Sequence, residues 1–203
     1  ANWCSIPNCD DTSINCNYID DMNDHPVNYI SWHQIMVFAS WVGARLPSET
    51  EWEYAARGLG QPILYPWGNL EPNCNLADYS PLGLGECNGI GTSPVCSYPD
   101  GNSLQGLCDM AGNVDEWTQD EHDLSQVDGL VGPIDGLAFC SDICPQNSLD
   151  PNYDPLSEEA RLLCGGTHFH DETGIHVAFR QSTSSDDGAG GRLARSTVPT
   201  FEP

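Results

Sequence analysis

Three histidines lie within one short stretch of a histidine-poor chain, LCGGTHFHDETGIHVAFR at residues 163–180. His168 and His170 are two positions apart, so they would point to the same side of an extended strand. With Asp171 or Glu172 beside them, the imidazoles would form a borderline-hard site suited to zinc, iron or copper(II). No HxxxH or facial-triad pattern supports that site. The alternative is a set of surface histidines on a binding face.

Composition excludes several kinds of partner. The chain of 203 residues has 30 acidic and 6 basic residues, a formal net charge of −24, and every basic residue is an arginine. A uniformly negative field repels nucleic acid and anionic membrane surfaces, so we expect neither as a partner. No apolar run approaches the roughly 20 residues that span a bilayer, so we expect no membrane span. The charge suits bound divalent cations and saline surroundings equally well.

The chain has ten cysteines, an even number that indicates a disulfide framework made in an oxidising compartment. A zinc-thiolate site would need paired close spacings, and only Cys140–Cys144 comes near. We therefore expect a secreted protein, extracellular or at the cell surface, although the spacing leaves the pairing open. The predicted disulfide cysteines are Cys4, Cys9, Cys16, Cys74, Cys87, Cys96, Cys108, Cys140, Cys144 and Cys164.

The sequence predicts two consecutive helices before the histidine-rich stretch. Apolar residues recur at helical spacing after Ser31, and Gly43 lies where the first helix would end. Ser48 and Glu51 form a capping-box pattern that starts a second helix, which Gly58 closes. We expect one domain over residues 1–203, with a disulfide-rich lead-in at 1–24 and a loop-like insertion at 121–156. Most of the chain between and after the helices is rich in Gly, Pro, Asn and Asp, so we expect irregular structure there.

Several blocks in a fixed order resemble the formylglycine-generating-enzyme-like domain, also called the sulfatase-modifying-factor domain. The RLPSETEWEYAARG and DMAGNVDEW blocks are highly specific, and the resemblance covers nearly the whole chain. The extra cysteines resemble those of the secreted, disulfide-bearing bacterial branch. The matching blocks are HPVNYISW at 25–32, ARLPSETEWEYAARG at 44–58, YPWGN at 65–69, SPVCSYPDGNSLQGLCDMAGNVDEW at 93–117, GGTHFH at 165–170 and GGRLAR at 190–195.

The resemblance implies an α+β fold, a variant of the C-type-lectin-like architecture with two helices and little β-structure. It also implies bound calcium, whose hard oxygen ligands would be the backbone of Gly112 and Val114 and the carboxylate of Glu116. Asn75 and the backbone of Leu76 match the start of the family's other calcium site, but its later aspartate falls near a cysteine here. The family's N-terminal portion before HPV is missing or replaced, so we expect either a fragment or a fold completed by a second chain.

The resemblance also identifies the positions at which oxidase chemistry would require cysteines. Formylglycine-generating enzymes oxidise a substrate cysteine with copper(I), which two thiolates hold in a GGSxxCxxxxC-like segment. Here His170 falls at the first cysteine and Ile175 or His176 near the second, so both thiols are absent. Cys164 precedes the glycines and is interpreted as half of a structural disulfide. We therefore predict no catalytic residue, with a metalloenzyme that uses His168, His170 and His176 as the alternative.

The same segment resembles the variable region of ligand-binding proteins diversified by retroelements, a second alternative. Its HFHD and STSSDDGAG pieces are drawn largely from the residues that such diversification yields. Our preferred interpretation is a non-catalytic, calcium-stabilised extracellular module that binds an unknown protein or glycan, or that self-assembles. The predicted ligand face comprises Thr167, His168, Phe169, His170, Asp171 and Arg180, and it extends to residues 182–190.

Overall fold

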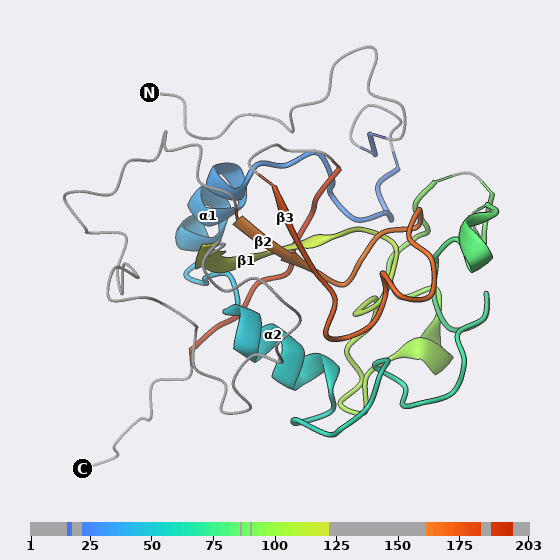
Figure 1. Cartoon of the computed structure of the whole chain (residues 1–203). Helices are drawn as coiled ribbons and strands as arrows, with labels where there is room; N and C mark the ends of the chain where they lie inside the picture. The colour runs from blue at the N-terminus through green and yellow to red at the C-terminus, as the bar shows by residue number, and fades with distance from the viewer. Residues whose placement is uncertain are drawn as a thin grey trace.

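The structure is a computed structural model that describes residues 16–17, 22–85, 87–89, 91–121, 161–183 and 188–196. Most of the predicted lead-in at 1–24 and nearly all of the predicted insertion at 121–156 lie outside these residues. The described chain contains two α-helices, two short 3-10 helices and one small sheet, which confirms the α+β prediction (Figure 1).

Both predicted helices are present and start as capping boxes. Helix α1 spans Trp32–Trp41, and Ser31 caps it while the Gln34 side chain accepts from the Ser31 backbone N–H. Helix α2 spans Glu49–Ala56 and uses Ser48 and Glu51 in the same way. These reciprocal bonds satisfy two backbone donors that a helix start otherwise leaves unpaired. The glycine after each C-cap residue has a positive φ, +68° after α1 and +58° after α2, as the predicted helix ends require.

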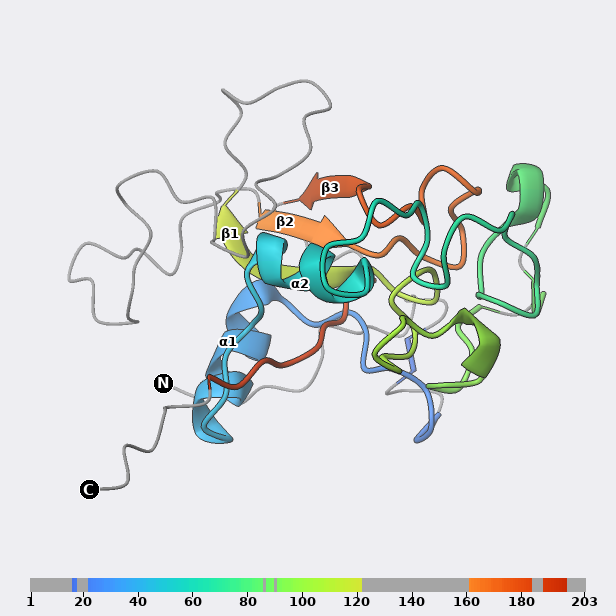
Figure 2. The ribbon, with the colours of Figure 1, turned by 90° about the horizontal axis from the view of Figure 1, so that it is seen from below.

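The sheet has three antiparallel strands in the order β1-β2-β3. Strand β1 spans Glu116–Glu121, β2 spans Arg161–Cys164 and β3 spans Arg180–Thr183. Strand β2 is buried along its whole length because it lies between the other two. Helices α1 and α2 pack against opposite faces of this sheet, because the adjacent strand residues Leu163 and Cys164 point to opposite faces and pack with α1 and α2, respectively. The irregular chain between α2 and β1 lies at the end away from α1 (Figures 1 and 2).

Three clusters of buried apolar side chains hold these elements together. The first joins α1 to the sheet through Trp32, Ile35, Trp117 and Leu163. The second joins α2 to the sheet, and the third packs under the irregular chain. Their buried members are, in turn, Trp52, Ala56, Met110, Cys164 and Val177, and then Tyr65, Ala77, Tyr79, Ala111 and Ile175. Among the aromatic residues of the helices, Trp32 and Trp52 are buried in these clusters, whereas Phe38 and Trp41 are exposed.

Polar contacts fix α2 against the sheet as well. The Asp120 carboxylate on β1 accepts from the first backbone N–H of α2, that of Glu49, at 2.6 Å. Arg180 on β3 pairs with Glu49 at 2.6 Å and also with Glu53, one turn further along the helix. These contacts hold the start of β3, which follows the histidine segment, in a fixed position relative to α2.

Two disulfides staple the irregular chain, Cys74–Cys87 and Cys96–Cys108. They confirm four of the ten predicted disulfide cysteines, and Cys16 is disulfide-bonded as well. Within the described residues, no helix is both long and apolar enough to cross a membrane.

Candidate functional site

The histidine segment forms a compact loop between β2 and β3. Two glycines begin it, and Gly166 has a φ of +73° and lies against the backbone of Gly174. A Cβ at Gly166 would stand 2.1 Å from the Gly174 carbonyl oxygen, so only glycine allows the loop to close here. The second glycine of the pair that resembles the family's GG is therefore required for a steric reason.

Each histidine of the loop contacts a different neighbour. The His168 backbone N–H and ring Nδ1 both lie within hydrogen-bonding distance of the Asn113 carbonyl oxygen, at 3.1 and 2.9 Å. His170 Nδ1 accepts from the Thr167 backbone N–H at 2.9 Å, and burial lowers the pKa of its imidazole. His176 Nε2 lies 3.0 Å from the Tyr65 hydroxyl. These contacts orient the rings separately.

The structure does not gather the three histidines around a common point. Among the residues it describes, the histidine, cysteine and acidic atoms close enough to share a metal ion belong to Cys96, Cys108 and Asp109. Two of those atoms are the sulfurs of a disulfide. The geometry therefore gives no support to the histidine metal site.

Cys164 is a free thiol, so the prediction that it forms a disulfide is wrong. It ends β2 and is fully buried in the core cluster beneath α2, beside Trp52 and Met110. Burial raises the pKa of this thiol to about 12 because the apolar surroundings disfavour the thiolate. The side chain behaves as a small core residue, which sequence alone could not separate from a cross-linked cysteine.

The predicted ligand face is only partly a surface. Phe169 is 58% exposed and Asp171 is also exposed, whereas His168 is buried. Thr167 and His170 are half-buried at the base of the turn. Arg180 does not belong to this face, because its guanidinium binds Glu49 and Glu53 of α2 and the carbonyl oxygens of Val177 and Phe179.

Hydrogen bonds within the loop hold the exposed residues in place. The Asp171 carboxylate accepts from the backbone N–H groups of Thr173 and Gly174 and from the Thr173 hydroxyl, and these bonds lower its pKa. The Phe169 backbone N–H donates to the Thr167 hydroxyl at 3.2 Å. An exposed aromatic ring on a loop held in this way suits recognition of a ligand.

Of the residues predicted to hold calcium at the family's second site, Gly112 and Val114 lie in a tight turn before β1, and Glu116 is the first residue of β1. Gly112 and Asn113 both have positive φ values, +75° and +68°. A Cβ at Gly112 would lie 2.0 Å from the Asp78 carbonyl oxygen, and that oxygen accepts from the Asn113 backbone N–H at 2.8 Å. The turn is therefore closed against a neighbouring strand-like segment, which fixes the direction in which β1 begins.

Glu116 is engaged by nitrogen donors. Its Oε2 accepts from the Trp52 indole N–H at 2.6 Å and from Arg192 Nε at 2.5 Å, and its Oε1 accepts from Arg192 Nη2. A carboxylate oxygen has two lone pairs, so Oε2 is fully used while Oε1 retains one. The residues present therefore fit calcium only if the ion shares the Glu116 carboxylate with Arg192. Glu116 would then offer Oε1 alone, together with the backbone of Gly112 and Val114.

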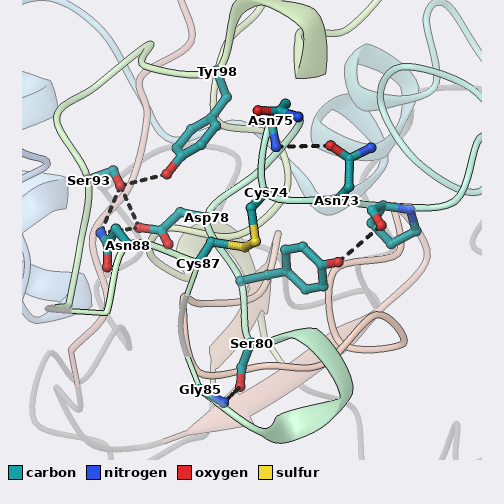
Figure 3. Close-up of a disulfide and its surroundings, with 12 residues drawn as sticks. Asn73, Cys74, Asn75, Asp78, Ser80, Gly85, Cys87, Asn88, Ser93 and Tyr98 are labelled. Carbon is teal, nitrogen blue, oxygen red and sulfur yellow. Dashed lines mark hydrogen bonds between the residues drawn. A yellow bond between two sulfur atoms is a disulfide. The ribbon is translucent and has the colours of Figure 1, made fainter.

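Asn75 and Leu76, which match the family's other calcium site, make contacts that do not favour an ion. The Asn75 backbone N–H donates to the Asn73 side chain at 3.0 Å, away from the buried carboxylate of Asp78 (Figure 3). Asp78 instead accepts from Ser93 and Asn88 beside the Cys74–Cys87 disulfide. The Leu76 carbonyl is packed on Gly101, where a Cβ would lie 1.6 Å from its oxygen. This packing leaves little room for an ion at the Leu76 oxygen.

Sequence reasoning missed two buried acids near the loop. Asp115 is 4% exposed, and burial raises its pKa to about 7, although the Gly166 backbone N–H partly offsets this. Asp120 is 1% exposed, and burial together with nearby Glu49 raises its pKa to about 6. Asp115 lies between Val114 and Glu116, and Asp120 lies between Gln119 and Glu121, so no local pattern distinguished these acids from the other acidic residues of the chain.

A small three-stranded sheet with two capped helices and long disulfide-linked irregular chain defines a recognisable class of α+β domain. The solved structure of PvdO from Pseudomonas aeruginosa has this fold, with a TM-score of 0.60 and 24% identity over 86% of this chain and 63% of that one. The family described as "Sulfatase-modifying factor enzyme 1-like domain" matches residues 3–197. The chain belongs to this family.

Curated relatives include active and inactive proteins by name. Formylglycine-generating enzymes from Streptomyces coelicolor and mouse are 35% and 36% identical, over 82% and 67% of this chain. A bovine protein named "Inactive C-alpha-formylglycine-generating enzyme 2" is 41% identical over 53% of this chain. The matched parts make up 50%, 37% and 37% of these relatives, so the chain spans half of their length or less.

Proposed function

We propose that this domain is a non-catalytic binding module whose ligand face is the exposed turn of the histidine loop. The observation that carries the proposal is the position of Cys164, the free thiol among the described residues. Cys164 is fully buried and its pKa is raised to about 12, so it offers no thiolate to a soft metal at neutral pH. The first of the family's copper-binding cysteines matches His170 and the second falls near Ile175 or His176, so neither position carries a thiol.

The loop itself supports a binding role. Phe169 presents an aromatic ring to solvent, and its neighbours Thr167 and Asp171 hold the turn through hydrogen bonds within the loop. A preorganised loop loses little conformational entropy when it binds, and an exposed aromatic residue supplies contact area. The inactive relative shows by its name that the family includes proteins without the enzyme activity.

We further propose that the domain acts outside the cell and is stabilised by calcium. Cys74–Cys87 and Cys96–Cys108 suit an oxidising compartment. The remaining lone pair of Glu116 Oε1 and the backbone oxygens of Gly112 and Val114 would hold the ion, and its charge would oppose the strong net negative charge of the chain. No chemical step depends on this ion.

The decisive experiment supplies the conditions for oxidase activity and looks for product. The purified protein is incubated with copper(I), oxygen and a cysteine-containing peptide, and aldehyde formation is followed by mass spectrometry. We expect no aldehyde and no stoichiometric copper. Turnover with one copper per chain, abolished by His168→Ala and His170→Ala but retained in His25→Ala, would reject the proposal in favour of a histidine metalloenzyme. His25 is the matched control because its ring contacts Thr92, outside the loop.

The binding role is tested on the exposed turn. Wild type and Phe169→Ala are compared on one array of glycans and extracellular proteins, with Leu70→Ala as a control for an equally accessible apolar residue elsewhere, since Leu70 is 65% exposed. We expect at least one binder that Phe169→Ala loses and Leu70→Ala keeps. Binders that ignore both substitutions would place the ligand face elsewhere.

A further inference from the structure

A cavity lies on another part of the molecule, beside α1. Its volume is about 490 Å³, within the range of pockets that hold small molecules. One wall is formed by residues of α1 between Gln34 and Trp41, and the facing wall is formed by the chain before α1 and by Gly191–Leu193. The apolar side chains of these walls include Val27, Ile30, Ile35, Phe38, Trp41 and Leu193.

The wall on α1 ends in two exposed aromatic rings. Phe38 is 47% exposed and Trp41 is 78% exposed, and their ring centroids are 6.0 Å apart. On the facing wall, Val27 is 58% exposed. The cavity therefore offers an apolar body a lining that includes open aromatic faces, which stack well on another ring.

The remaining part of the cavity lining includes charged side chains, and negative charges outnumber positive ones among them. Asp109, Glu116 and Arg192 all contribute to it. The Arg192 guanidinium is balanced by the Glu116 carboxylate, which it binds through two nitrogens. Asp109 then remains as an additional carboxylate, whose Oδ2 accepts from the Cys96 backbone N–H at 2.7 Å. An anionic group entering the cavity would meet this carboxylate, whereas a cation would be attracted to it.

The field of the whole chain acts in the same direction. The net charge is −24 and every basic side chain is an arginine. Four of these arginines, Arg45, Arg57, Arg180 and Arg192, are paired with glutamates of the same chain. A mobile anion is repelled by such a surface and a mobile cation is concentrated near it.

From this arrangement we propose that, in the calcium-free protein, the cavity beside α1 binds a small arylalkyl amine, with its ring against Phe38 and Trp41 and its ammonium group toward Asp109. The apolar wall selects the body of the ligand, and the uncompensated carboxylate selects the sign of its charge. This site is distinct from the exposed turn at Phe169, which does not line the cavity.

Two probes of nearly the same shape and opposite charge test the assignment. Titrations with 2-phenylethylammonium and with 3-phenylpropionate are followed by calorimetry and by tryptophan fluorescence, in buffer containing a chelator. We expect the ammonium to bind at least about tenfold more tightly than the carboxylate, because a single charge contact in a partly desolvated site is worth more than that factor. Equal affinities, tighter binding of the carboxylate, or no binding of the ammonium would overturn the proposal.

Variants separate the cavity from the general field. Trp41→Ala leaves the charge unchanged and should weaken 2-phenylethylammonium about tenfold, the scale of one aromatic contact. Asp109→Asn should bring the two probes close to equal affinity, and its melting curve establishes that it is folded. Trp67→Ala, whose ring stacks on Tyr65 and lies outside the cavity lining, should change neither affinity.

Two outcomes with these variants would contradict the site. Ammonium binding that is unchanged in Trp41→Ala would mean that the amine follows the net charge rather than the cavity. Sedimentation that shows a dimer dependent on Trp41 would mean that a second copy of the chain covers the wall. Either result removes the small-molecule assignment.

Discussion

Glu116, the first residue of β1, and Arg192, in the C-terminal segment, form an ion pair through two nitrogens and both carboxylate oxygens. The same guanidinium donates to the carbonyl oxygens of Cys108 and Asp109, at 3.1 and 3.2 Å. Trp52 of α2 donates to Glu116 as well. A single buried carboxylate thus links α2, β1 and the C-terminal segment.

Removal of the arginine should destabilise the domain strongly. In Arg192→Ala the Glu116 carboxylate, which is 5% exposed, loses its positive partner and remains buried. Breaking a buried pair in this way costs about 3–5 kcal/mol, because one charge is left uncompensated. Urea unfolding measures the loss. Arg195→Ala is the control, since Arg195 is exposed and donates to the Val42 carbonyl, and it should change the free energy of unfolding little.

Calcium should raise the melting temperature if Glu116 contributes a ligand. We expect a chelator to lower the melting temperature of the wild type and to have a smaller effect on Glu116→Gln, which keeps the shape of the side chain but lacks its charge. Differential scanning calorimetry with and without chelator makes the comparison. A chelator effect that is the same in both proteins would place the ion elsewhere, and none in either would argue against calcium.

The buried acids predict a pH dependence with a defined sign. In the folded state the pKa of Asp115 is raised to about 7, so the folded protein retains a proton that the unfolded chain loses near the usual aspartate pKa of 3.8. The contribution of Asp115 to stability is therefore largest at acid pH, falls as the pH rises through this window, and is constant above about 7.

The substitution Asp115→Asn isolates this contribution. The amide cannot ionise, so the variant should be more stable than the wild type at pH 8, by an amount of the order of a few kcal/mol, and the difference should shrink toward pH 5. Urea unfolding across this range measures it. Asp24→Asn, at a side chain that is 76% exposed, is the matched control. A gain that grows toward acid pH would have the wrong sign.

Cys164 should be protected from alkylation in the folded protein. The thiol has no exposed surface and its pKa is about 12, so iodoacetamide at pH 8 should leave it unmodified until denaturant is added. Peptide mass spectrometry reports the state of this cysteine alone. Rapid labelling of Cys164 in the native protein would show that β2 opens readily.

Loss of the Cys74–Cys87 disulfide should destabilise the irregular half of the domain. The bond closes a loop with a sequence separation of 13, and such a cross-link is worth about 3 kcal/mol. The double variant Cys74→Ser with Cys87→Ser should unfold at lower denaturant concentration than the wild type. Under reducing conditions the two proteins should differ less, because the wild type then loses the same bond.

Local signals in the sequence were sufficient for the helices. The capping pattern of Ser48 and Glu51 and the glycines after both helices depend on neighbouring residues, and the structure has them as predicted. The sheet was harder to predict. Its strands are four to six residues long and pair residues far apart, such as Glu116 with Cys164, so no local pattern marks them.

The site was only partly predictable for the same reason. The steric role of Gly166 and the exposure of Phe169 lie within the loop that the sequence singled out. The partners of Arg180 and the free state of Cys164 depend on α2 and on the core behind the loop. Such long-range contacts decide whether a charged residue faces a ligand or holds the fold, and spacing does not encode them.

The burial and ion pairing of the arginines affect how the protein can be cleaved by trypsin. Trypsin cleaves only after lysine or arginine, and in this chain all six such residues are arginines within the described residues. Arg161 is buried over the Trp32 ring, and Arg180 and Arg192 are held in ion pairs that join α2 and β1 to distant segments. The peptide bonds after these three arginines become accessible to trypsin when the sheet opens and the ion pairs break. Tryptic cleavage after them would therefore serve as a built-in reporter of local unfolding around the sheet.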